Sequence, residues 1–133
     1  MSERLFTITP QPILTAKGAT GFGTKMEVKS FQHVVIDFGT SGNTNATVKL
    51  QGSIQENVDF TAAASATNRW DYISFVNLQT GAAVAGDTGL AWTGTDAMEI
   101  IEANCSGLYF VNIQVSAHAA GAISANGVGF TNK

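Results

Sequence analysis

The sequence has few charged residues and few of the residue types that commonly perform chemistry. Only 13% of its 133 residues are charged, about half the share of an average globular protein. A single cysteine, Cys105, excludes an intrachain disulfide and a thiolate metal cluster. The seven lysines and arginines are scattered from Arg4 to Lys133, and the net charge is −3. A nucleic-acid backbone therefore finds no basic patch to bind.

The sequence also lacks the long apolar run of a transmembrane segment and the basic start of a signal peptide. We therefore expect a protein that is intracellular when it is synthesised, with no membrane partner. Hydrophobic residues make up 44% of the chain, enough for the core of one domain. Small uncharged residues replace the missing charges, and this favours strands because exposed helix faces normally carry Glu, Lys and Arg.

Apolar and polar residues alternate in several short segments, as they do in half-buried strands. In residues 31–38, Val34, Ile36 and Phe38 share one face, and residues 108–117 contain the longest alternation. Glycine-rich turns separate such segments at intervals of roughly ten residues, which is typical of a β-sandwich or a small barrel. The sequence thus predicts an all-β fold.

Several connections can be predicted from the turn residues. Residues 31–38 and 46–54 read as a β-hairpin with a long polar tip. The alanines of residues 60–67 favour a helical turn, whereas residues 97–103 fit a helix or a strand. A closing strand after Gly121 should pair back through a turn.

Residues 1–30 differ from the rest, and we interpret them as an N-terminal arm or edge segment beside a β-sandwich domain of residues 31–133. Both prolines, Pro10 and Pro12, lie here and interrupt strand pairing. The arm is apolar enough to bury itself on another copy or another protein. The alternative is that it forms the first strand of the sandwich itself. The residues expected at such an assembly interface are Leu5, Phe6, Ile8, Ile13 and Leu14.

No constellation of residues predicts catalysis or a cofactor. A zinc site of His33, His118 and Asp37 is conceivable, but neither histidine has a second ligand at i+2 or i+4. Glu99 and Glu102 are three residues apart, which places them on opposite faces of a strand and does not form a carboxylate pair. We therefore expect a protein that is not an enzyme and holds no metal.

Trp92 is the aromatic residue expected near the surface, because it lies in a stretch rich in glycine and threonine. An exposed tryptophan can stack on a sugar ring. The sequence therefore leaves open a glycan-binding module with Trp92 as a ligand contact. That alternative predicts that Trp92→Ala leaves the fold and assembly intact while ligand binding is lost.

Three segments together resemble structural proteins of tailed bacteriophages. Residues 47–54 (TVKLQGSI) end in a Gly-Ser corner, and a later strand begins with Trp70-Asp-Tyr-Ile. In residues 104–122 (NCSGLYFVNIQVSAHAAGA) a glycine leads into a long alternating strand and a small-residue turn. The likeness covers roughly residues 31–131. The chain has Tyr109 and Phe110 where such proteins often carry an arginine.

The resemblance implies a single antiparallel, jelly-roll-like β-sandwich on a virion. Within that group, a one-domain chain is most similar to the decoration, or cement, proteins that bind and stabilise a capsid shell. The expected partners are then the major capsid protein and copies of the chain itself, as a homotrimer. The other roles open to such a domain are those of a tail, baseplate or head-fibre subunit.

Overall fold

The computed structural model describes residues 4–6 and 10–132, and every regular element within them is a β-strand. The prediction of an antiparallel all-β fold is confirmed. The strands are β1 (Arg4–Phe6), β2 (Gln11–Lys17), β3 (Gly21–Phe22), β4 (Met26–Glu27), β5 (His33–Ser53), β6 (Asp71–Tyr72), β7 (Phe75–Asn77), β8 (Ala83–Val84), β9 (Leu90–Thr93), β10 (Met98–Asn104) and β11 (Phe110–Asn132).

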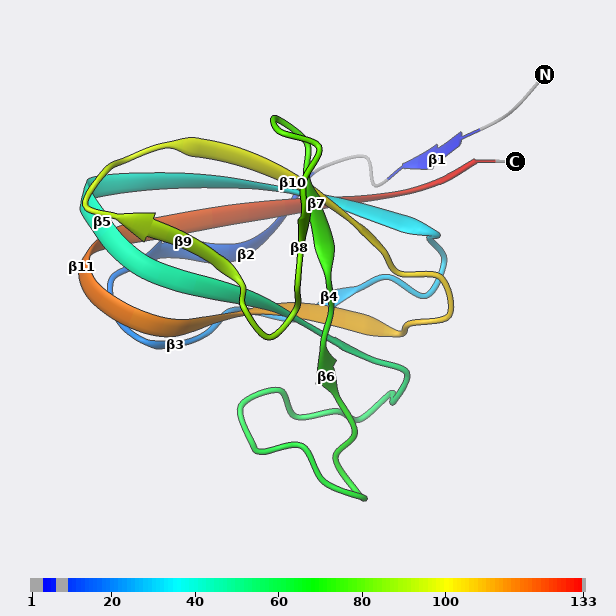
Figure 1. The fold of residues 1–133 in the computed structure, drawn as a ribbon. Coiled ribbons are helices and arrows are strands. Elements are labelled where there is room, and N and C mark those ends of the chain that lie inside the picture. The colour runs from blue at the N-terminus through cyan, green and yellow to red at the C-terminus, as the bar shows by residue number, and fades with distance from the viewer. Residues whose placement is uncertain (1–3, 7–9, 133) are drawn as a thin grey trace.

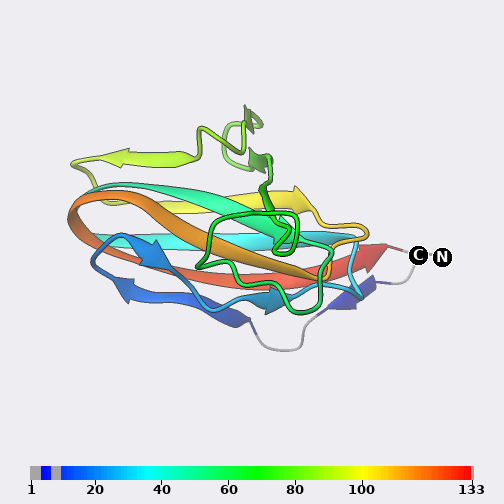
Figure 2. The same cartoon turned by 90° about the horizontal axis from the view of Figure 1, so that it is seen from below.

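Two long strands form the frame of the molecule. β5 has 21 residues and β11 has 23, and they pair antiparallel from Ser53 and Phe110 to His33 and Phe130. Figures 1 and 2 show both strands turning back at one end of the molecule, so that their two halves lie in different layers. One continuous sheet therefore folds over itself to make a sandwich.

The turning point is a corner built from residues that accept a left-handed backbone. Gly42 and Asn43 of β5 have φ angles of 85° and 54°, and Gly121 of β11 has a φ of 87°. The ladder between β5 and β11 shifts register several times here, as β-bulges do where a sheet bends. Asp96 stabilises the corner, because its carboxylate accepts hydrogen bonds from the backbone N–H groups of Asn43 and Thr44 at 3.1 and 3.0 Å.

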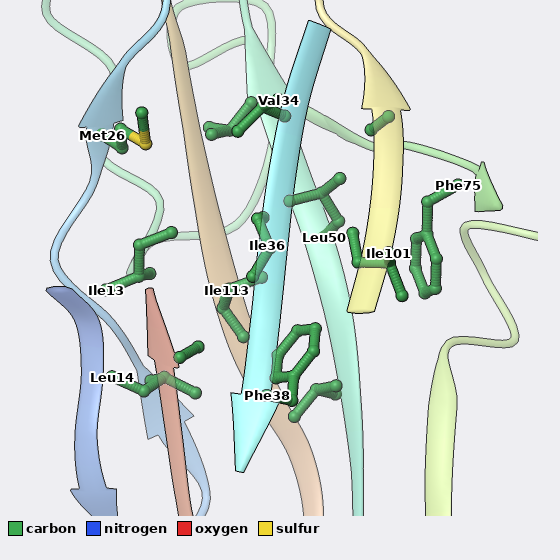
Figure 3. Packing of buried hydrophobic residues seen from close by; sticks show 14 of the residues in the cluster. Ile13, Leu14, Met26, Val34, Ile36, Phe38, Leu50, Phe75, Ile101 and Ile113 are labelled. Carbon is green, nitrogen blue, oxygen red and sulfur yellow. The ribbon is translucent and has the colours of Figure 1, made fainter. Parts of the chain in front are cut away.

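The core fills the concave side of the folded sheet. The alternation seen in the sequence is confirmed, since Val34, Ile36 and Phe38 are buried together on the inner face of β5. Leu50, from the other half of β5, belongs to the same cluster, as does Ile113 from β11 (Figure 3). One strand thus contributes to both layers of one core.

Shorter strands extend this frame to two opposite edges. β2, β3 and β4 all pair with β11 on one side. On the other side, β10 pairs with the first half of β5, and β7 and β8 follow in order. β6 and β9 pair with the second half of β5. Viewed from below, the blue strands β2 and β3 lie along one side and the green β7 and β8 along the other (Figure 2).

The predicted hairpin of residues 31–38 and 46–54 is wrong. Both segments belong to β5 and pair with β11. The glycines and asparagine between them bend one strand without reversing it in the plane of the sheet. The expected closing strand after Gly121 is wrong for the same reason, because it continues β11. Residues 60–67 form turns and bends without a helix, and residues 97–103 fall almost entirely in β10.

The N-terminal residues contribute to the molecule's own sheet. Ile13 and Leu14 are each 3% exposed and belong to the core cluster. The expectation that Ile13 and Leu14 are buried on a partner is therefore wrong. The alternative holds for these two residues, since they belong to a strand of the sandwich itself, β2. Leu5 and Phe6 lie in β1, opposite Thr131 and Phe130 of β11. Ile8, the remaining residue of the expected interface, lies outside the described residues.

Candidate docking surface

Large aliphatic side chains are exposed together on the outer face of β7 and β10. The relative exposure is 69% for Met98, 47% for Leu78, 46% for Ile100 and 37% for Val76. They share one face because Leu78 donates its N–H to the Ile100 carbonyl at 2.9 Å, so the two residues lie opposite each other. We call these four residues the β7–β10 patch.

The neighbouring residues of the same strands point inward. Phe75 and Ile101 are buried in the core, so alternation sends the residues of the β7–β10 patch out to solvent. Leu78, Gln79, Met98 and Ile100 line a hollow of about 340 Å³. Single exposed apolar residues are ordinary, whereas a contiguous group on a sheet face marks a place where another molecule docks.

Two acids lie beside this patch in the sheet register. Glu102 lies opposite Val76, and Asp37 lies opposite Ile100. No lysine or arginine occurs anywhere between residues 70 and 132, a stretch that includes β6 to β10 and β11. The acids of that stretch are Asp71, Asp87, Asp96, Glu99 and Glu102. A partner for the patch therefore meets acidic surroundings.

The opposite edge carries lysines. Lys17 ends β2, and Lys25 and Lys29 flank β4. We call these three residues the lysine edge. Lys25 donates to the Val58 carbonyl at 3.2 Å and lies 4.4 Å from the centre of the Phe110 ring.

Two hollows adjoin this edge. One, of about 500 Å³, is lined in part by Lys25, and the other, of about 350 Å³, includes Lys17 and Phe22 in its wall. Three of the seven basic residues of the sequence thus lie along one edge, where Lys29 forms an ion pair with Glu27 at 3.1 Å. The signal for this was present in the sequence as the long stretch without lysine or arginine.

The expectation that Trp92 lies near the surface is wrong. Trp92 is 4% exposed and packs edge to face on Phe38, with the ring centres 5.8 Å apart. It faces inward because β9 pairs with β5, which places Trp92 opposite buried Ala46. Its indole N–H has no hydrogen-bond partner among the described residues. Trp92 therefore offers no ring face to a sugar.

The histidines and acids considered for zinc are engaged separately. His33 stacks on Phe130 with the ring centres 5.1 Å apart, and His118 lies at the corner with Nε2 2.8 Å from the Gly121 carbonyl. Asp37 accepts the N–H of Asn126 at 3.2 Å. Nowhere in residues 4–6 and 10–132 do three His, Cys, Asp or Glu side chains come close enough together to hold a metal ion.

Two buried amides lie side by side on the outer face of the second layer. Gln51 and Asn112 are register partners on β5 and β11, and they are 0% and 2% exposed. The Gln51 amide donates to the Phe60 carbonyl at 3.0 Å, which holds the loop of residues 54–70 over this face. Neither side-chain oxygen has a hydrogen-bond partner within the described part of the chain.

Cys105 is expected to react slowly with thiol reagents in the folded protein. Burial raises the pKa of its thiol to about 11, so almost none of it is the reactive thiolate at pH 8. Labelling with iodoacetamide at pH 8, with and without denaturant, measures this. The unfolded chain should react at the rate of a free cysteine and the folded chain about a hundredfold more slowly. Equal rates would contradict the burial of Cys105.

No helix suited to crossing a membrane occurs in residues 4–6 and 10–132. No protein-family model matches the chain, and no curated protein matches its sequence.

The solved structures that share the fold include two of prophage proteins. The SPBc2 prophage-derived protein YomS matches with a TM-score of 0.67 and 12% identity, over 98% of this chain and 95% of that one. The PBSX exported protein XepA matches with a TM-score of 0.69 and 11% identity, over 97% of this chain and 38% of that one. The chain therefore spans less than half of XepA, and it has the fold of a protein of prophage origin.

Proposed function

We propose that this chain is a structural protein of a phage virion, which binds the capsid shell as a decoration protein and stabilises it. The observation that carries the proposal is the β7–β10 patch, an exposed apolar surface on a fold that a prophage-derived protein shares. Such a surface suits protein–protein assembly, because apolar side chains can be buried without desolvating ions.

The proposed action is mechanical. A homotrimer presents three copies of each contact, so contacts that are weak singly add up once the first is made. Such an oligomer bridges neighbouring capsid subunits and resists their separation. The low charge of the chain favours this role, since the cores of protein interfaces are depleted of charged residues.

We expect Met98→Glu to weaken binding to shells of the phage that encodes the chain by about tenfold or more, because an apolar contact becomes a buried unpaired charge. Met98 is 69% exposed, so the fold itself should tolerate the change. Cosedimentation of the purified protein with empty shells measures the affinity. The thermal stability of the shells, with and without the protein, measures the stabilisation.

Ile54→Glu is the matched control, because Ile54 is 72% exposed but lies on β5's connection to the next loop, away from the β7–β10 patch. It should bind like the unchanged protein. If Met98→Glu and Ile54→Glu bound shells equally well, the β7–β10 patch would not be part of the contact with the shell. Binding of the unchanged chain to tails and not to shells would replace decoration by a tail or baseplate role.

A further inference from the structure

A hollow on the outer face of the second layer contains a buried amide in its wall. The loop of residues 54–70 lies across the first half of β11 here (Figure 2), and the hollow beside it measures about 180 Å³. Residues 58–61 of the loop line one side, and Gly23, Lys25 and Asn112 complete the wall. We call this the Asn112 hollow. It is separate from the β7–β10 patch, whose strands extend the first half of β5.

The amide of Asn112 is available for a partner. The residue is 2% exposed, and its Oδ1 has no hydrogen-bond partner among the described residues. Such a buried polar atom costs free energy, so native proteins seldom keep one without a reason. The last torsion of an asparagine turns easily. Gly23 leaves room for this rotation, because a β-carbon at that position would lie 3.1 Å from Oδ1.

The loop holds a carboxylate in the same wall. Oδ1 of Asp59 accepts the N–H and O–H of Thr61 at 2.9 and 2.6 Å, and these hydrogen bonds lower the pKa of Asp59. Asp59 also exchanges two hydrogen bonds of 2.8 Å with Asn68 through its backbone. Gln51 fastens the loop to the sheet through the Phe60 carbonyl. A wall that is already ordered in this way loses little conformational freedom when a ligand binds.

The wall fits a neutral ligand that carries several hydroxyl groups. Lys25 brings one positive charge and Asp59 one negative charge, so the wall has no net charge that would attract an ion. Lys25 donates hydrogen bonds, Asp59 accepts them and Asn112 does both. A hydroxyl group also does both, so it can pair with each of the three. Val58 and Phe60 add the apolar part that small-molecule sites usually have.

The size of the hollow indicates a ligand of about one sugar ring. Sites for drug-sized molecules measure roughly 300–1,000 Å³, whereas one water takes about 30 Å³. The Asn112 hollow, at about 180 Å³, lies between these values. It shares Lys25 with the hollow of about 500 Å³ and Gly23 with the hollow of about 350 Å³. A longer chain of sugar units can therefore continue along this edge of the molecule.

We propose that the Asn112 hollow binds one sugar unit of a carbohydrate, with Asn112, Asp59 and Lys25 as its polar contacts. The site is distinct from Trp92, which faces the core from β9. It is also independent of shell binding, because it uses none of the residues of the β7–β10 patch.

The test uses the full chain labelled with ¹⁵N. The probes are glucose, N-acetylglucosamine, the β-1,4-linked tetramer of each, and calcium chloride. Asn112→Leu is the main variant, because leucine has a similar shape and leaves no polar atom unsatisfied. Asp59→Asn removes the charge and keeps the oxygen that Thr61 binds. Asp87→Asn is the matched control, since it makes the same change at an exposed acid outside the wall of the hollow.

We expect at least one of the four sugars to shift the side-chain NMR signals of Asn112 and the backbone signals of residues 58–61, with a Kd of about 1 mM. Asn112→Leu and Asp59→Asn should each weaken this binding by about tenfold or more. Asp87→Asn should bind like the unchanged chain. Thermal melts should show that Asn112→Leu is at least as stable as the unchanged chain. An amide with a purely structural role would instead be needed for stability.

The absence of any shift with all four sugars, at concentrations far above the expected Kd, would overturn the inference. Sugar binding that Asn112→Leu and Asp59→Asn leave unchanged would overturn it too, because the ligand would lie elsewhere. If calcium chloride alone shifted the signals of Asn112, the hollow would be a cation site and the sugar assignment would be wrong. Shell binding is measured separately. An Asn112→Leu protein that binds shells but no sugar would support both proposals independently.

Discussion

Gly121→Ala is expected to destabilise the protein by about 2–5 kcal/mol, the sum of a left-handed backbone penalty and overpacking. Gly121 has a φ of 87° at the corner of β11. A β-carbon there would lie against the Thr44 hydroxyl, 2.6 Å from the Thr44 Cα and 2.8 Å from the Ser41 carbonyl oxygen. Because two of these contacts are with backbone atoms, the corner itself would have to open. Urea denaturation measures the change in the free energy of unfolding.

Gly107→Ala is the matched control for this substitution. Gly107 has a φ of 85°, but apart from its two neighbours in the chain no residue in the described structure has an atom within 4 Å of the place where its β-carbon would be. Only the backbone penalty of about 1–2 kcal/mol should therefore appear. Equal losses for the two variants would show that the corner is loosely packed.

Trp92→Ala should cost about 3–5 kcal/mol of stability, as large-to-small substitutions in cores do. The ring is buried between the layers against Phe38, and its removal leaves a cavity that the folded sheet cannot readily close. A thermal melt and urea denaturation measure the loss. The glycan-binding alternative predicts the opposite result, namely an intact fold with ligand binding lost.

Trp92→Phe distinguishes the contribution of the ring's volume to stability from that of the indole N–H group. The indole N–H of Trp92 is buried without a partner, so phenylalanine removes an unsatisfied donor along with part of the ring. We expect it to cost clearly less than Trp92→Ala. A Trp92→Ala protein as stable as the unchanged chain would mean that Trp92 is not part of the core.

The local pattern of apolar and polar residues was sufficient to predict which segments form strands, but not which strands pair with one another. Alternation placed Val34, Ile36 and Phe38 on one buried face, because strand periodicity is a property of neighbouring residues. The hairpin was mispredicted because glycine and asparagine serve equally in a turn and in a bend. What decides between them at Gly42 and Asn43 is pairing with β11, far away in the sequence.

The docking surface depends on the same long-range pairing. Met98 and Ile100 are exposed because they point away from the core on the outer face of β10. That residues 97–103 form a strand at all is decided by pairing with β5, which is distant in the sequence. Trp92 was mispredicted because its glycine and threonine neighbours resemble a surface loop, whereas its pairing with β5 turns it inward. The stretch of residues 70–132 without lysine or arginine needed no structure to be seen.

The pairing of β5 with β11 also has a consequence for how the chain is made. His33 pairs with Phe130 and Ser53 with Phe110, so the central ladder joins residues 33–53 to residues 110–130. Bringing such distant segments together costs chain entropy before the burial of apolar side chains compensates that cost. We therefore expect folding to be slow. On the ribosome, β5 must wait without its main partner until synthesis has passed residue 130. During that interval its apolar face is open to chaperones or to aggregation.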